Sequence, residues 1–205
     1  MDKERDMLKF ERELISCGFR LIAGVDEAGR GPLAGPVVAA CVIMPMEGMI
    51  EGIDDSKALS EKKRAMYFGK IREQAIDYGV GIVDHETIDE INILNATKLA
   101  MKKAVESMKV KPDFVLVDAV KKLDISCKQM GIIKGDALSY MIASASIIAK
   151  ETRDAMMRDY AVKYPDYGLE RHKGYGTKEH RNRILTLGPC PIHRRSFLKK
   201  ILGEA

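Results

Sequence analysis

The segment from residue 21 to residue 44 restricts the fold of this chain more than any other part of the sequence. A short apolar run at residues 21–25 leads directly into Asp26 and Glu27, and a turn rich in glycine and proline is followed by a longer apolar run at residues 36–44. Two strands joined by a turn fit this pattern. A dinucleotide-binding loop needs a helix after its glycines and a P-loop needs Gly-Lys-Ser/Thr, so both nucleotide-binding classes are disfavoured.

The rest of the chain alternates between helical and strand patterns. Helical periodicity is expected at residues 1–18, in a helix that follows the polar stretch at 54–63 and runs through residue 73, and at 87–108, 138–160 and 177–187. Apolar runs indicate strands at 80–83, 114–117 and 130–133. This alternation is typical of an α/β domain with a mixed sheet. We predict that residues 1–165 form this domain, with a short N-terminal helix at 1–18, and that residues 166–205 form a basic helical C-terminal extension.

The composition is that of a globular protein. Of the 205 residues, 46% are hydrophobic and 31% are charged, which supplies both a core and a polar surface. No uncharged apolar run approaches the length of about 18 residues that a membrane span needs, and the N-terminus is too charged for a secretory signal. The four cysteines are scattered, which favours reduced thiols. We expect a cytoplasmic monomer with no membrane partner.

The formal net charge of +4 is unevenly distributed along the chain. Residues 150–205 carry 13 Lys/Arg against 7 Asp/Glu, a charge of +6, which leaves −2 for residues 1–149. A basic end of this kind is either a solvated surface or a surface that faces a polyanion. Charge alone does not separate these two interpretations.

Carboxylates stand at the ends of several predicted strands. Asp26 and Glu27 follow the first apolar run, Asp118 follows the run at 114–117, and Asp136 precedes the helix at 138–160. Adjacent strand residues point to opposite faces, so Asp26 and Glu27 share a site only if the strand ends there, as we expect it to. Taken singly, Asp118 is equally an ordinary turn residue and Asp136 an ordinary helix N-cap. Together, clustered acids favour Mg²⁺ or Mn²⁺, which take oxygen ligands.

Seven motifs in this order resemble bacterial ribonuclease HII over most of residues 20–197. They are GVDEAGRGPLAGPVVAACVI, DDSKALSEKKR, INILNATKLAM, FVLVDA, KGDALSYMIASASIIAKETRD, HKGYGTKEH and GPCPIHRRSF. The resemblance implies a ribonuclease H-like fold, with a mixed five-stranded sheet flanked by helices and a helical C-terminal extension. It also implies hydrolysis of the RNA strand of RNA/DNA hybrids and nicking on the 5′ side of ribonucleotides embedded in duplex DNA.

The resemblance assigns roles to individual residues. It implies that Asp26, Glu27, Asp118 and Asp136 are the catalytic acids and hold two Mg²⁺ or Mn²⁺ ions, leaving a 5′-phosphate and a 3′-hydroxyl. The turn at residues 29–31 and Tyr175 would read the ribose 2′-hydroxyl. The complete set of expected substrate-binding residues is Gly29, Arg30, Gly31, Ser56, Lys57, Asn92, Ser146, Lys150, Tyr175, Arg194 and Arg195.

Two other functions are compatible with parts of this pattern. Ribonuclease HIII shares the fold, but it has an N-terminal binding domain, for which the 25 residues before Asp26 leave no room, and it prefers Glu where Asp136 stands. A non-catalytic hybrid-binding protein would keep the basic extension, yet four acids beside an anionic substrate would weaken its binding. A sliding clamp is a possible protein partner that the sequence neither supports nor excludes.

Overall fold

The computed structural model describes residues 6–53, 56–120 and 122–203. Its elements follow the predicted alternation of strands and helices, and the first five residues of the predicted helix at 1–18 lie outside the described ranges. The strands are β1 (Ile22–Ala28), β2 (Val37–Ile43), β3 (Asp77–Val83), β4 (Phe114–Asp118) and β5 (Lys128–Ile132). The helices are α1 (Lys9–Ser16), α2 (Glu61–Gln74), α3 (His85–Glu106), α4 (Tyr140–Lys163), α5 (Leu169–His172), α6 (Lys178–Leu187) and α7 (Arg195–Leu202), with 3₁₀ turns η1 (Gly135–Ala137) and η2 (Pro165–Tyr167).

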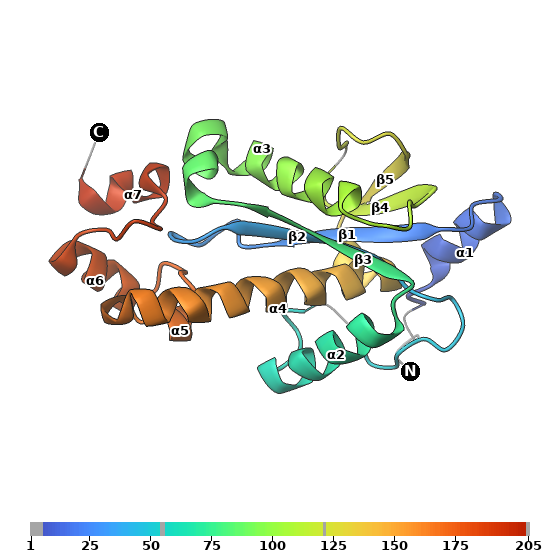
Figure 1. Ribbon diagram of the computed structural model, residues 1–205, viewed down its shortest axis with the longest axis horizontal. Helices are drawn as coiled ribbons and strands as arrows, with labels where there is room; N and C mark the ends of the chain where they lie inside the picture. The colour runs from blue at the N-terminus through green and yellow to red at the C-terminus, as the bar shows by residue number, and fades with distance from the viewer. Residues whose placement is uncertain (1–5, 54–55, 121, 204–205) are drawn as a thin grey trace.

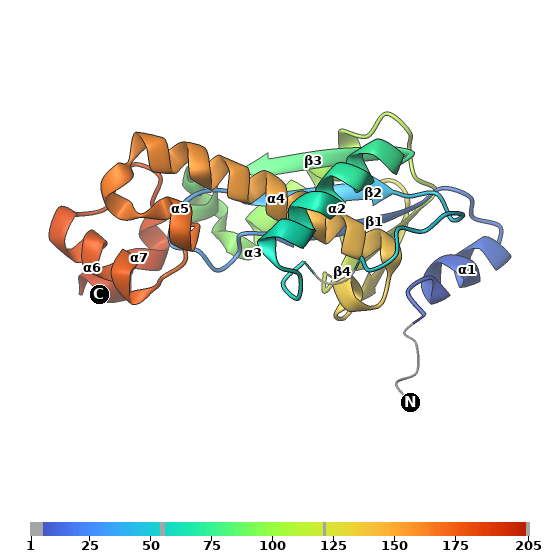
Figure 2. The same ribbon diagram turned by 90° about the horizontal axis from the view of Figure 1, so that it is seen from below.

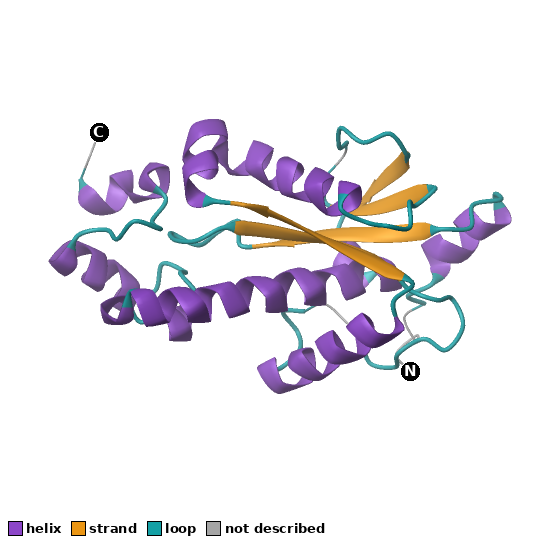
Figure 3. Cartoon of the chain, in the orientation of Figure 1, coloured by secondary structure: helices purple, strands orange, loops and turns teal. Residues whose placement is uncertain are grey.

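The strands form one mixed sheet in the order β3-β2-β1-β4-β5 (Figure 1). The β1–β2 and β2–β3 pairs are antiparallel, whereas β1–β4 and β4–β5 are parallel. The predicted mixed five-stranded sheet is therefore confirmed. Figure 3 shows that the long helices lie on both sides of this sheet, so its central strands are shielded from solvent.

The first strand extends further than the sequence suggested. Asp26 and Glu27 lie opposite Ala40 and Ala39 of β2, and the pairing continues to Ala28. The expectation that the strand ends at the two acids is therefore wrong, because antiparallel hydrogen bonding to β2 keeps the backbone extended. In an extended strand these two neighbouring side chains point to opposite faces of the sheet.

Two helices cover the central strands, one on each face of the sheet. Helix α3 packs on one face, and α4 packs on the other across β1 and β2, with α2 outside it (Figures 1 and 2). The helix α4 approaches very closely at Gly24, where an added Cβ would lie 2.1 Å from the main-chain carbon of Met141. The small residues that follow in α4, Ala143 to Ser146, are all buried. No helix in the described parts of the chain has the length and apolarity to cross a membrane.

The C-terminal extension packs against the turn between β1 and β2. Leu33 of the turn shares a small apolar cluster with Ile184 of α6 and Leu198 of α7. Helix α6 agrees with the prediction, with Thr177 as its N-cap and Gly188 as its C-cap, whereas α7 was not predicted. The division of the chain at residue 165 stays a prediction, and the contact shows that the extension supports a loop beside the acidic residues.

Candidate active site

Three of the predicted acids converge at one edge of the sheet. Val25 of β1 lies opposite Val117 of the parallel strand β4, so Asp26 and Asp118 are the next residues on neighbouring strands. Asp136 reaches them from η1, directly after β5. Oxygen atoms of the three carboxylates all lie within 4.8 Å of one another. We call Asp26, Asp118 and Asp136 the acidic cluster.

Local contacts hold each member of the acidic cluster in place. The Gly135 N–H donates to Asp118 Oδ1 at 2.6 Å, and the Glu27 N–H donates to Asp26 Oδ1 at 2.7 Å. Asp136 is not the helix N-cap, because Ser139 caps α4 by accepting a hydrogen bond from the N–H of Ile142. Asp136 is thus free of a capping role, and its carboxylate lies 3.3 Å from Lys57 Nζ.

The electrostatics of the acidic cluster favour a bound cation. Burial, together with the carboxylates of Glu27 and Asp118, raises the pKa of Asp26 well above its usual value. Burial also raises the pKa of Asp118, with a contribution from Asp136, although the Gly135 N–H opposes the shift. Each raised pKa means that the charged carboxylate is destabilised in its surroundings. A divalent cation would remove this repulsion, and an all-oxygen ligand set suits Mg²⁺ or Mn²⁺.

Glu27 lies beside the acidic cluster but is not one of the three acids that meet there. Its Oε1 is 3.4 Å from the Arg30 guanidinium, and its buried Oε2 has no hydrogen-bond partner among the described residues. Burial raises the pKa of Glu27, and the Arg30 charge lowers it. A buried carboxylate oxygen without a donor is costly, so this oxygen is suited to binding a cation.

A cleft of about 320 Å³ adjoins Glu27 and gathers most of the predicted substrate-binding residues. Ser146 lies beneath it, buried, with its hydroxyl 2.8 Å from that of Ser56. Tyr175 is 42% exposed, so its ring remains open to a ligand. The cleft is lined by Glu27, Ala28, Gly29, Arg30, Gly31, Ser56, Lys57, Lys150 and Tyr175.

Three predicted contact residues occupy other positions. Asn92 interrupts α3 with a φ of 65°, and its side-chain oxygen accepts hydrogen bonds from the N–H groups of Leu94 and Asn95. Arg194 is fully buried and donates to main-chain carbonyls, so it does not face a phosphate as we expected. Arg195 is exposed at the start of α7, outside the lining of the cleft.

Arg153 is a residue of this region that sequence reasoning missed. It is 1% exposed and reaches from α4 to the carbonyls of Ala34, Pro36 and Lys173. The spacing of Ser146, Lys150 and Arg153 is four and then three residues, which places them on one face of a helix. That spacing was the available signal in the sequence.

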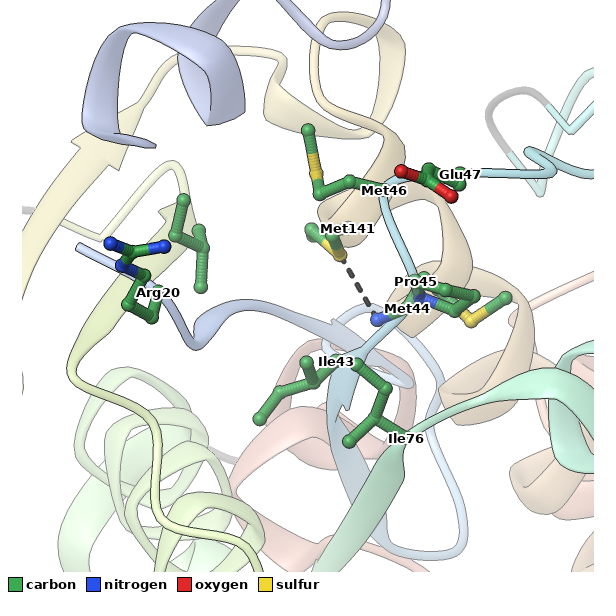
Figure 4. Close-up of a pocket in the computed structure, with 9 residues that line it drawn as sticks. Arg20, Ile43, Met44, Pro45, Met46, Glu47, Ile76 and Met141 are labelled. Atoms are coloured by element: carbon green, nitrogen blue, oxygen red, sulfur yellow. Dashed lines mark hydrogen bonds between the residues drawn. The ribbon is translucent and has the colours of Figure 1, made fainter. Parts of the chain in front are cut away.

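A separate hollow of about 360 Å³, shown in Figure 4, lies where β1 begins and β2 ends. The acidic cluster is at the other end of β1, so this hollow is not part of the candidate site.

The mixed sheet, with three carboxylates from adjoining segments at one edge, defines the class as a ribonuclease H-type nuclease. A solved structure of ribonuclease H2 from Pyrococcus horikoshii OT3 has a TM-score of 0.74 and 30% identity, covering 90% of this chain and 98% of that one. The structure described as the PCNA:RNase HII complex from Archaeoglobus fulgidus has a TM-score of 0.72 and 26% identity, covering 86% and 94%.

The comparison of sequences specifies the family. The family model for ribonuclease HII matches residues 23–200. A curated relative named ribonuclease HII, from Ruminiclostridium cellulolyticum, is 55% identical over 202 residues, which are 98% of this chain and 79% of the relative. The chain belongs to the ribonuclease HII family and is an endoribonuclease of the ribonuclease H type. The predicted fold and family are confirmed.

Proposed function

We propose that this protein hydrolyses the RNA strand of RNA/DNA hybrids and nicks duplex DNA on the 5′ side of an embedded ribonucleotide. The observation that carries the proposal is the acidic cluster, whose carboxylate oxygens lie within 4.8 Å of one another beside a cleft with basic residues. Water attacks the phosphorus, the bond to the 3′-oxygen breaks, and that oxygen takes up a proton. The products carry a 5′-phosphate and a 3′-hydroxyl.

The residues present fit a site for two Mg²⁺ or Mn²⁺ ions. Asp26, Asp118 and Asp136 would be ligands, and the unpartnered Oε2 of Glu27 would supply a further oxygen. When bound, such ions activate a water molecule and neutralise the charge that develops on the phosphate. The Gly135 N–H keeps Asp118 oriented, and the Ser56 and Ser146 hydroxyls form a polar layer under the site.

The cleft supports substrate binding from two sides of the reacting phosphate. Lys57 is exposed beside the cluster, and Lys150 is held by Asp154, with Nζ to Oδ distances of 2.6 and 2.7 Å. Both lysines suit contacts to the nucleic-acid backbone, which position a duplex without reading its sequence. The glycine-flanked turn and Tyr175 suit contact with the ribose, since both line the cleft and Tyr175 is exposed.

A DNA duplex that contains one ribonucleotide tests the proposal directly. We expect a single nick 5′ to that residue with Mg²⁺ or Mn²⁺, and no nick with EDTA or with the matched all-DNA duplex. End-group analysis of the products should find a 5′-phosphate and a 3′-hydroxyl. Tight hybrid binding without a nick under all metal conditions would instead support a non-catalytic binding protein. Binding to a sliding clamp is a separate question, which a pull-down with purified clamp would test.

A further inference from the structure

Arg194 places a fully buried guanidinium under the turn that borders the cleft. Its Nη2 donates to the carbonyls of Gly29 at 2.6 Å and Pro36 at 3.1 Å, its Nη1 to that of Arg30 at 3.1 Å, and its Nε to that of Gly35 at 2.9 Å. All three guanidinium nitrogens are therefore used within one loop. The side chain comes from the C-terminal extension, whereas the loop belongs to the β1–β2 connection.

Arg153 supports the same loop from α4. Its guanidinium donates to the carbonyls of Pro36 at 3.0 Å and Ala34 at 3.1 Å, so the Pro36 carbonyl accepts from both arginines. Gly29 has a φ of 98°, and a Cβ there would lie 2.1 Å from Arg153 Nε. The turn therefore packs directly against two buried guanidinium groups. We call the two residues that carry them, Arg153 and Arg194, the arginine brace.

The arginine brace determines which way the peptide groups of the turn face. In a trans peptide the C=O and N–H point in opposite directions, and the described residues include no cis peptide. Because Arg194 draws the Gly29 and Arg30 carbonyls inward, the N–H groups of Arg30 and Gly31 point outward. Neither N–H has an acceptor among the described residues, and both residues line the cleft.

We propose that Arg194 is a positioning residue for ribose recognition, which fixes the turn so that the Arg30 and Gly31 N–H groups face the 2′-hydroxyl oxygen of the substrate. This inference rests on the proposed function. Burial and the neighbouring Arg153 lower the pKa of Arg194 to about 9, so the side chain is still charged at neutral pH. Its carbonyl partners offset the cost of burying that charge.

The chemistry of the contact requires arginine. A planar guanidinium presents donors in a fixed fork and spans several carbonyls, whereas a lysine ammonium is a single compact charge. Arg194→Lys therefore keeps the positive charge but loses the simultaneous contacts to Gly29, Arg30 and Gly35. Arg183→Lys is the matched control, because Arg183 is exposed on α6, away from the cleft.

Duplex binding in EDTA measures recognition without cleavage. We would determine Kd by fluorescence anisotropy for a duplex with one ribonucleotide and for the all-DNA duplex of the same sequence. For Arg194→Lys we expect the preference for the ribonucleotide duplex to fall by about tenfold, as loss of about 1.4 kcal/mol implies, with Arg183→Lys unchanged. Equal weakening on both duplexes, or no weakening at all, would overturn the proposal.

Kinetics and hydrogen exchange separate positioning from general destabilisation. With Mg²⁺, Arg194→Lys should raise KM while kcat stays within about threefold, because the acids are untouched. Amide exchange over residues 29–36 of the free protein should accelerate in Arg194→Lys but not in Arg183→Lys. If the wild type makes no nick at the ribonucleotide with Mg²⁺, the proposed function fails. The arginine brace itself is then refuted only if exchange over residues 29–36 is also unchanged.

Discussion

Charged side chains are buried in two neighbouring regions of this protein, and the two regions stabilise them differently. In the arginine brace, the guanidinium groups of Arg153 and Arg194 donate only to main-chain carbonyls within the described structure, with each nitrogen partnered. In the acidic cluster, carboxylates face one another, and the adjacent Glu27 Oε2 has no donor. Every guanidinium nitrogen of the brace has an acceptor, whereas burial and the neighbouring carboxylates still raise the pKa values of Asp26 and Asp118 despite the N–H groups that they accept from.

This difference separates residues that bind a ligand from residues that position others. A buried charged side chain whose hydrogen-bonding groups are all paired within the protein needs no ligand. Its removal is expected to disturb the loop to which it is bonded. A buried charge without partners destabilises the free protein unless a ligand completes it. The acidic cluster is therefore expected to respond to metal ions and the arginine brace to be indifferent to them. Of the four predictions, the first and the last test this contrast, and the other two concern the buried histidines and Tyr175 in the neighbouring C-terminal extension.

The largest effect is expected from Asp118→Asn. The substitution keeps an oxygen acceptor for the Gly135 N–H but removes the charge that faces Asp26 and Asp136. We expect cleavage with Mg²⁺ to fall by roughly 10³-fold or more, comparable to losing a major electrostatic contribution to catalysis. Hybrid affinity should stay within a few-fold. Asp124→Asn, an exposed acid in the following loop, is the control; full activity of Asp118→Asn would refute the metal-site assignment.

The second prediction concerns a chain of buried histidines in the C-terminal extension. The Cys190 N–H donates to His193 Nδ1 at 3.0 Å, so the His193 Nε2 proton is directed to His180 Nε2 at 3.1 Å. The His180 Nδ1–H then donates to the Tyr175 carbonyl at 3.0 Å. This arrangement requires both rings to be neutral. Burial lowers the pKa of each ring to about 4.

The sign of the pH dependence follows from these pKa values. In the unfolded chain His180 and His193 bind protons near pH 6.5, whereas in the folded protein they do so only near pH 4. The stability that the neutral rings contribute is therefore fully present above pH 6.5 and is lost as the pH falls toward 4. The shift corresponds to about 3 kcal/mol for one histidine. Urea titrations between pH 7 and 4.5 should show this slope reduced in His193→Gln and kept in His85→Gln. An unchanged slope in His193→Gln would contradict the neutral hydrogen-bonded chain.

The sequence predicted the ligand-binding region better than the supporting region. Asp26, Asp118 and Asp136 were identifiable because acids at strand ends gather wherever parallel strands end together. The direction of Glu27 was not, since it depends on pairing to β2 that continues past the acids. Arg194 was predicted as a contact to the substrate, and its full burial is a finding of the structure, since arginine is rarely fully buried. Its four carbonyl partners lie 158 to 165 residues away, a separation that local pattern does not reveal.

The third prediction concerns Tyr175, which the histidine chain holds through its carbonyl. Its ring lies 3.7 Å from the position of a Cβ on Gly31 and 5.9 Å from the Arg153 guanidinium. We expect Tyr175→Ala to lower kcat/KM at a single embedded ribonucleotide by roughly tenfold, equivalent to about 1.4 kcal/mol of lost contact. Tyr175→Phe separates the hydroxyl from the ring, and Tyr160→Ala, outside the cleft, is the control. Unchanged kinetics would remove Tyr175 from substrate recognition.

The smallest effect is expected on stability without metal. In EDTA, Asp118→Asn removes one of three mutually repelling carboxylates while the Gly135 N–H keeps an acceptor. Because the folded state raises the pKa of Asp118, its charged form destabilises the fold near pH 7, and this penalty disappears in acid, where the carboxyl is protonated in both states. In EDTA at pH 7 we expect the Tm of Asp118→Asn to exceed that of the wild type by a few degrees, as about 1 kcal/mol produces in a domain of this size. Mg²⁺ should make the wild type the more stable of the two, because it stabilises only the wild type. Arg183→Lys should leave both Tm values unchanged, and a lower Tm for Asp118→Asn in EDTA would show that this carboxylate already has the partners it needs.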